Sequence, residues 1–380
     1  MFVDAMNGCG ASNERKDPMS QKESLTEEEA TFGQADAEQP IPPADIVAYN
    51  ELRSCADLFR MHANGKLELQ PDFQREVVWK QDDQSRFIDS LVKQLPIPSM
   101  CFSLDYKTQR WKVIDGLQRM SSIVRFLSMT EWRLSDLTDI HPQLRNAKNT
   151  DLRNGTEEQK RLFALVEDVS IPVTVIRCDY TQKSHMLYLF TIFHRLNSGG
   201  VRLTNQEIRN CIYTGLFNDK LKEFDRKNSD WKAVKRRIWG SMERFRSVEV
   251  LLRILAFSEN RDKYDGNLAR FLNEYMYQRT VQTDKSIEDL DKRLSLVAAR
   301  AHNVLAAEKQ RKLPLLFVEA LLVALDVHRN ELIAKTTEDL GLQYANMRAR
   351  PSFTESARYA VSSADNVKRR LNAAIEAFTS

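Results

Sequence analysis

The stretch WKVIDGLQR, Trp111–Arg119, contains the end of a strand and the start of a helix. An apolar run of β-forming residues ends at Asp115 and Gly116, and a helical pattern begins directly after them. A strand that passes straight into a helix N-terminus brings several backbone N–H groups and the positive end of the helix dipole to one point. We therefore expect an anion site at this turn.

The residues on either side of this stretch predict the rest of a small α/β domain. Met100–Leu104 and Trp111–Ile114 are strand-like and are joined by the polar DYKTQR, as in a hairpin or meander. Ile171–Ile176 is a further strand candidate, since β-branched residues fill its second half. Two amphipathic helices are expected, with apolar positions at Phe87, Ile88, Leu91, Val92 and Leu95 before Pro96, and at Met120, Ile123, Val124 and Leu127.

The N-terminal part divides into a tail and the start of the globular region. Residues 1–48 are rich in Asp, Glu, Gln, Ser and Pro, and such a composition cannot bury enough apolar surface to offset the entropy lost on ordering. We therefore expect an acidic, polar, disordered tail. After it, Leu52, Cys55 and Phe59 predict a short helix, and Leu67–Leu69 alternates like a short strand.

The second half of the chain predicts one helix after another. A helix through Leu189, Phe193 and Leu196 is expected to end at the NSGG of residues 197–200, and Thr204 with Glu207 forms a capping box for the next. Further helices are predicted from the stripe Val248, Leu251, Leu252 and Leu255, from the apolar run Leu315–Val327, from Ser352 with Glu355 as a cap, and over Val367–Phe378. The prediction is an α+β fold in which a small α/β domain, residues 49–205, precedes an all-α helical domain, residues 206–380.

Composition excludes several classes of protein. The chain has 380 residues, 42% hydrophobic and 29% charged, and no apolar run approaches the ~20 residues that a spanning helix needs. No signal peptide is recognisable, so we expect a soluble cytoplasmic protein without membrane association. Five scattered cysteines, none in a CxxC pair, indicate neither a disulfide framework nor a thiolate metal site. The net charge of +3 allows nucleic acid as a partner without requiring it.

The turn itself offers the parts of a phosphate site. Arg119 carries a planar fork that suits phosphate, and Asp115 is available to hold Mg²⁺ or orient a water. A nucleotide or phosphodiester would fit such a turn. The alternative needs no ligand, because Asp is a good N-cap, Gly116 permits a tight turn, and an exposed Arg has no special task.

Four motifs in order give the chain a family resemblance. They are PDFQR with Trp79, IDSL with PIP, VIDGLQR, and FHRLN through QEIRN, within Pro71–Asn210. The chain thereby resembles the N-terminal domain family of GmrSD-type restriction endonucleases, over roughly Tyr49–Tyr213. That family is similar in fold to ParB and sulfiredoxin, whose shared Gly-x-x-Arg turn binds nucleotide phosphates.

The resemblance implies roles for particular residues. In the family an Asp-Gly-Gln-Gln-Arg motif is linked to nucleotide binding and hydrolysis, and the domain helps to sense modified phage DNA. It thus implies Asp115, Gln118 and Arg119 as the catalytic residues for a Mg²⁺-bound nucleoside triphosphate, with Gly116 admitting the phosphate. Leu117 stands where the first Gln of the motif usually is, which favours binding over turnover.

Two further groups are predicted to share the cleft if the fold is ParB-like. Gln74 and Arg75 would face Arg119, and two arginines in one cleft suit a triphosphate or a DNA backbone. Arg195 and Asn197 precede two glycines that let the backbone approach a ligand. The alternatives are a surface Arg paired with a neighbouring carboxylate and a simple helix end.

The run WKAVKRRIWGSMERFR, Trp231–Arg246, interleaves basic and aromatic residues. Lys232, Lys235 and Arg236 share a helical face, so a DNA-tracking surface with stacking aromatics is possible, and the alternative is a solvated face with its aromatics in the core. The six histidines form no cluster of the nuclease type, which implies that a separate partner protein supplies any nuclease.

Three hypotheses for function follow. The first is a nucleotide-binding, possibly NTP-hydrolysing, DNA-directed protein of a restriction or phage-defence system, with nucleoside triphosphate and Mg²⁺ at the turn. The second is a non-catalytic DNA-recognition or regulatory module that works with a separate nuclease. The third is DNA nicking by the ParB-like cleft itself.

Overall fold

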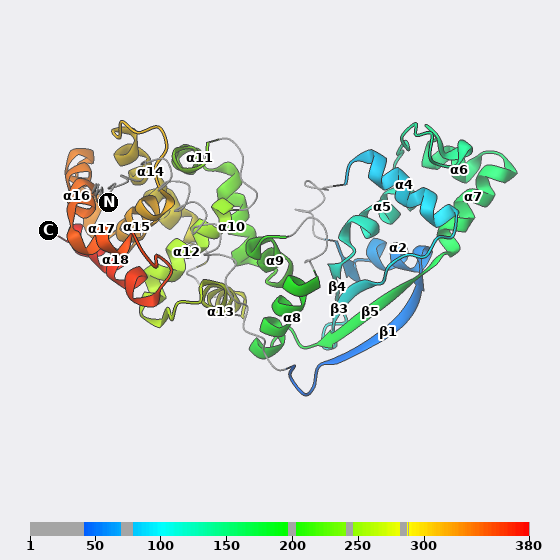
Figure 1. Ribbon diagram of the computed structural model, residues 1–380, viewed down its shortest axis with the longest axis horizontal. Helices are drawn as coiled ribbons and strands as arrows, with labels where there is room; N and C mark the ends of the chain where they lie inside the picture. The colour runs from blue at the N-terminus through cyan, green and yellow to red at the C-terminus, as the bar shows by residue number, and fades with distance from the viewer. Residues whose placement is uncertain are drawn as a thin grey trace, which may run out of the picture.

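The computed structural model describes residues 42–69, 79–196, 203–240, 246–281, 287 and 289–379. A small sheet with its covering helices forms one end of the molecule, and helices alone form the other (Figure 1). The fold class expected from the sequence is confirmed, because no strand follows Cys178 in the described ranges. The predicted tail lies outside these ranges up to residue 41.

One mixed five-stranded sheet organises the first part. In chain order its strands are β1 (Val47–Ser54), β2 (Leu67–Glu68), β3 (Met100–Asp105), β4 (Trp111–Asp115) and β5 (Ser170–Cys178). In space the order is β1-β5-β3-β4-β2, with β3 antiparallel to β4 and parallel to β5. The predicted hairpin and the strand around Ile171–Ile176 are therefore confirmed.

The edge strand β1 corrects one prediction. Leu52 was expected in a helix with Cys55 and Phe59, but it lies in β1, paired with Pro172 of β5. The helix α2 (Cys55–Ala63) begins only after Ser54, whose side chain accepts a hydrogen bond from the Asp57 backbone N–H. The apparent helical spacing thus ran across the boundary between a strand and a helix. The strand also begins at Val47, two residues before the predicted start of the domain.

Helices cover one face of the sheet and enclose an apolar cluster that we call the sheet core. They are α2, α4 (Gln81–Val92), α5 (Leu117–Leu127), the short α6 (Asn149–Asn154) and α7 (Glu157–Asp168). The sheet core includes Leu58, Ile88, Phe102, Ile123 and Val173, each almost completely buried. The helix α4 ends at Val92, so Leu95, expected on its apolar stripe, lies beyond it and is half exposed.

The opposite face of the sheet belongs to a second cluster that we call the helical core. Ile114 and Ile176 of the sheet pack with Leu189 of α8 (Lys183–Leu196), and the cluster continues through α9 (Asn205–Ile212) into the remaining helices. In Figure 1, α8 and α9 lie between the sheet and those helices. The sheet and the helical part therefore share one continuous apolar cluster.

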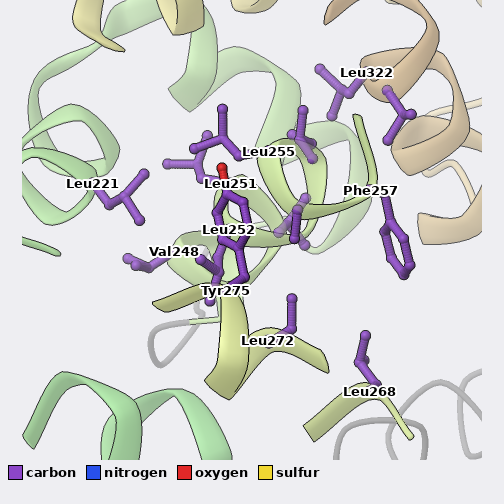
Figure 2. Packing of buried hydrophobic residues seen from close by; sticks show 14 of the residues in the cluster. Leu221, Val248, Leu251, Leu252, Leu255, Phe257, Leu268, Leu272, Tyr275 and Leu322 are labelled. Carbon is purple, nitrogen blue, oxygen red and sulfur yellow. The ribbon is translucent and has the colours of Figure 1, made fainter. Parts of the chain in front are cut away.

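The helical part is built around α12 and α15. Its helices are α10 (Leu216–Lys227), α11 (Ser229–Ile238), α12 (Arg246–Asn260), α13 (Leu268–Val281), α14 (Leu290–Ala306), α15 (Leu315–Val327), α16 (Thr337–Ala349), α17 (Pro351–Ser356) and α18 (Ala364–Ala377). The predicted stripe of α12 is fully buried, and Figure 2 shows Leu251 and Leu255 among side chains of neighbouring helices. The run Leu315–Val327 is central, as its apolar character predicts.

Two smaller predictions for this part have different outcomes. The capping box of α9 is confirmed, since Thr204 accepts from the Glu207 N–H and the Glu207 carboxylate accepts from the Thr204 N–H. The cap expected at Ser352 is wrong, because α17 begins at Pro351 and its N-cap is Arg350. With Pro351 at the first helical position, the helix begins two residues earlier than it would with Ser352 as its cap.

Four of the five cysteines lie in the described part of the chain. Cys55, Cys101, Cys178 and Cys211 are buried and form no disulfide. Burial raises the pKa of the Cys55 and Cys178 thiols to about 12, so they stay protonated near neutral pH. None of the described helices combines the length and apolar character needed to cross a bilayer.

Candidate functional site

The turn between β4 and α5 depends on the conformation of its glycine. Gly116 has φ 95° and ψ 16°, a left-handed conformation that other residues rarely adopt. A Cβ at this position would lie 2.6 Å from Met100 Cγ on the neighbouring strand and 2.9 Å from its Sδ. Backbone geometry and the close approach of β3 therefore both require glycine here.

Asp115 and Arg119 face one another across the first turn of α5. The Arg119 guanidinium donates to Asp115 Oδ2 at 2.8 Å, to the carbonyl of Pro98, and to the carbonyl of Ser99 at 3.4 Å. Its side chain is 13% exposed and that of Asp115 is 36% exposed. Burial lowers the pKa of Arg119 and the Asp115 carboxylate opposes that shift, and an arginine remains cationic throughout the physiological range.

This arrangement differs from the ligand-free alternative drawn from the sequence. The N-cap of α5 is Gly116 rather than Asp115, whose carboxylate pairs with Arg119 instead of capping the helix. Arg119 is also not an idle exposed side chain. No side chain of the described residues caps α5, so the N–H groups of its first turn lie beside a cation and a carboxylate.

Gln118 and Leu117 point to different neighbours. Gln118 Oε1 lies 3.4 Å from the backbone N of Trp79, the first described residue after 70–78. Leu117 is partly buried and packs against both the sheet core and the helical core. Leu117 therefore joins the two apolar clusters, and this packing explains why an apolar side chain stands there.

Four further residues were predicted to share the cleft with Arg119, and one of them, Arg195, lies in the described part of the chain. Gln74, Arg75 and Asn197 lie outside the described residues. Arg195 is exposed in the last turn of α8. Whether these side chains share a cleft with Arg119 stays a prediction.

The predicted DNA-binding residues lie on α11 but are not equivalent. Lys232 and Arg236 are exposed, whereas Lys235 donates to Asp225 Oδ1 at 3.0 Å. Trp231 is completely buried, and its indole N–H donates to the same carboxylate at 2.7 Å. Trp231 therefore fits the alternative in which the aromatic residues of this run lie in the core, because a fully buried ring has no free face for stacking.

Sequence reasoning missed a buried polar network behind α9. The Arg209 guanidinium is fully buried and donates to Asn273 Oδ1 at 2.9 Å and to Glu249 Oε2 at 3.0 Å. Glu249 also accepts from Arg253 at 2.6 Å, and Arg253 lies 3.5 Å from Glu319 of α15. The charged residues of the QEIRN motif were therefore a signal of structure, since α9 is buried along its whole length.

Lys112 of β4 is the second group that the sequence did not single out. It is buried, and its ammonium donates to the carbonyl of Ile212 at 3.1 Å and to Thr214 Oγ1 at 2.9 Å, with the Tyr180 ring 4.6 Å away. Burial lowers its pKa. A lysine inside an apolar strand was the feature of the sequence that could have identified this group. The Lys112 side chain links the sheet to the segment between α9 and α10.

No protein cage for a metal ion is present among the described residues, where no three His, Cys, Asp or Glu side chains are suitably grouped. Mg²⁺ needs no such cage, because proteins commonly hold it with one or two carboxylates and the phosphates of a substrate. The half-exposed carboxylate of Asp115 fits that arrangement.

Comparison with known proteins gives one positive result. Residues 55–214 match the family model described as GmrSD restriction endonuclease, N-terminal domain. The match runs from the start of α2 to just beyond α9 and includes the whole Asp115–Arg119 turn. Comparisons with curated proteins and with solved structures give no match.

Proposed function

Since residues 55–214 match the N-terminal domain of GmrSD restriction endonucleases, we propose that this protein is a component of a DNA-directed restriction or phage-defence system. Within that system, its Asp115–Arg119 turn binds a nucleoside triphosphate. A partner nuclease would supply the DNA cleavage.

One observation carries the nucleotide site: the N-terminus of α5, which no described side chain caps, lies beside the Arg119 guanidinium. A phosphate at this point accepts hydrogen bonds from backbone N–H groups and is favoured by the helix dipole. Arg119 adds a cation whose position is already set by the carbonyls of Pro98 and Ser99. A preset cation loses little conformational entropy when it binds an anion.

The Asp115 carboxylate is the reason why nucleotide binding at this turn would need a divalent cation. A phosphate that approaches Arg119 competes with the Asp115 carboxylate, which lies 2.8 Å from the guanidinium. The like charges of carboxylate and phosphate repel, and a divalent cation between them removes that repulsion. Mg²⁺ held by Asp115 and the phosphates would supply charge neutralisation. Binding is therefore expected to depend on Mg²⁺.

Leu117 favours binding without turnover, which is our second candidate function. Its side chain packs between the two cores and offers no polar group to orient a water molecule. A non-catalytic DNA-recognition or regulatory module that senses nucleotide is consistent with this packing. Nucleotide hydrolysis is the alternative, and phosphate release tests it. DNA nicking by the same turn stays a hypothesis.

The experiment measures equilibrium binding of fluorescent ATP and GTP analogues, with and without Mg²⁺. We expect Arg119→Ala to weaken binding at least about tenfold, as loss of a charge-assisted contact does. We expect Asp115→Asn to remove the Mg²⁺ dependence while metal-free binding improves, because the competing negative charge is gone. Arg110→Ala is the matched control, since Arg110 pairs with Glu68 at the far end of the hairpin.

The same samples separate the two candidate functions. Phosphate release with the wild-type protein, lost in Asp115→Asn, would support hydrolysis over the non-catalytic module. Saturable binding without release would support the module. Equal nucleotide affinity of wild type and Arg119→Ala, both folded by circular dichroism, would reject the nucleotide site at this turn.

A further inference from the structure

Two basic segments that are far apart in the sequence lie side by side in the helical part. One is α11 from Lys232 to Arg237, and the other is the KQRK of residues 309–312, which follows α14. The Leu313 N–H donates to the Arg237 carbonyl at 2.7 Å. The Arg237 guanidinium returns two bonds, to the carbonyls of Glu308 at 2.8 Å and Gln310 at 2.7 Å.

These contacts create a surface that we call the α11 basic surface. Its members are exposed cationic side chains from both segments: Lys232, Arg236, Lys309, Arg311 and Lys312. The Lys312 ammonium lies 4.0 Å from the position that a Cβ on Gly240 would occupy, so the second segment reaches past the end of α11. Arg237 is the positioning residue of this surface, because its backbone and side chain both hold the 308–313 segment.

The positive charge of this surface is not neutralised from within. None of its five members has an ion pair to a carboxylate in the described parts of the chain. The neighbouring acids are already engaged elsewhere: Asp225 with Lys235 at 3.0 Å, Asp230 with His302 at 2.9 Å, and Glu308 with Arg348 at 2.7 Å. Among the described residues, five exposed cations therefore lack a carboxylate partner.

Local structure accounts for only part of this pattern. Lys and Arg in the last turn of α11 favour the negative end of the helix dipole. That reason does not apply to residues 309–312, which belong to no helix. The surface also carries none of the large exposed hydrophobic side chains of the described residues, which a membrane-binding or protein-docking face would use.

We propose that the α11 basic surface binds the phosphate backbone of double-stranded DNA without reading its sequence. The choice of DNA among polyanions rests on the proposed function, whereas the surface itself rests on the contacts above. Lys and Arg contacts to phosphates release counterions, which makes such binding strongly dependent on salt. Base identity is read by other contacts, so this surface supplies affinity and orientation.

The test is fluorescence anisotropy with a labelled 30-base-pair duplex of arbitrary sequence, from about 50 to 300 mM NaCl. We expect the triple variant Lys309→Glu, Arg311→Glu, Lys312→Glu to weaken binding at least about tenfold at 100 mM NaCl and to reduce the salt slope by about 0.9 per lost contact. The double variant Lys232→Glu, Arg236→Glu is expected to act in the same direction, because it removes the α11 half of the surface.

The matched control is Lys66→Glu, Arg358→Glu, Arg369→Glu, which changes the net charge equally at exposed positions outside the surface. Control and triple variant with the same affinity and slope would overturn the proposal. So would tighter binding to vesicles rich in anionic lipid than to the duplex. Nucleotide binding at the Asp115 turn is expected to survive in the triple variant. A wild-type protein that binds the duplex but no nucleotide would count against the proposed nucleotide site and not against this surface.

Discussion

The side chain of Met100 fills the space in which a Cβ of residue 116 would lie, with Cγ 2.6 Å from that position. This contact sets the distance between the start of β3 and the β4–α5 turn. It thereby also lets Arg119 reach the carbonyls of Pro98 and Ser99 just before β3. Packing on one side of the turn fixes the cation on the other.

Gly116→Ala is expected to lower the free energy of unfolding by about 2–4 kcal/mol. The variant forces a side chain into left-handed backbone geometry, which costs about 1–2 kcal/mol, and into overlap with Met100. Urea unfolding measures the change. The double variant with Met100→Ala should show a coupling that relieves the overlap but not the backbone cost. A loss below about 0.5 kcal/mol in the single variant would contradict the close approach.

Leu117→Gln is expected to destabilise the fold by about 1–2 kcal/mol. The amide replaces an apolar side chain that packs against both cores, so apolar contact is lost and a polar group is partly desolvated. Thermal unfolding measures this. Leu117→Met is the control, since it conserves volume and apolar character. Equal melting temperatures for the two variants would mean that Leu117 does not join the cores.

Lys112 is expected to make the free energy of unfolding depend on pH in the alkaline range. Burial lowers its pKa in the folded protein below the unfolded value of about 10.4, so between the two values the unfolded chain binds more protons. The free energy of unfolding contributed by this group therefore rises with pH across that interval. Urea unfolding is measured for the wild type and Lys112→Met from pH 7.5 to 10.5. Over this range the free energy of unfolding of the wild type should increase relative to that of Lys112→Met. The exposed Lys66→Met is the control, and a constant difference for Lys112→Met would refute the prediction.

Glu249 is expected to give a dependence of the same sign in the acidic range. Burial would raise its pKa, but Arg253 and Arg209 outweigh that effect and lower it. A carboxylate whose folded pKa is lowered contributes stability that is present above about pH 4.3 and is lost as the pH falls through the folded value. Glu249→Gln should cost about 3–5 kcal/mol near neutrality, and this gap should narrow toward pH 3. The exposed Glu157→Gln is the control, and a gap independent of pH would contradict the network.

Local patterns predicted the centre of the sheet and the helices around the turn because the relevant signals are short in range. The apolar run of β4, the glycine and the stripe of α5 each span a few residues, and all three were predicted correctly. The edge strand β1 was missed because Val47, Tyr49 and Leu52 are all substantially exposed, so no alternation marks it. Its register is set by β5, more than 100 residues away.

Short-range signals in the sequence specify the strand, the glycine and the helix that make the turn, and the apolar runs that form the helical part. The contacts between these elements follow from tertiary packing. Arg119 meets Pro98 and Ser99, Leu117 meets two cores, and residues 309–312 join α11, because packing brings together groups whose separation in sequence carries no local signal. Backbone preferences act over a few residues, whereas a site for phosphate or DNA depends on which distant charges share one surface.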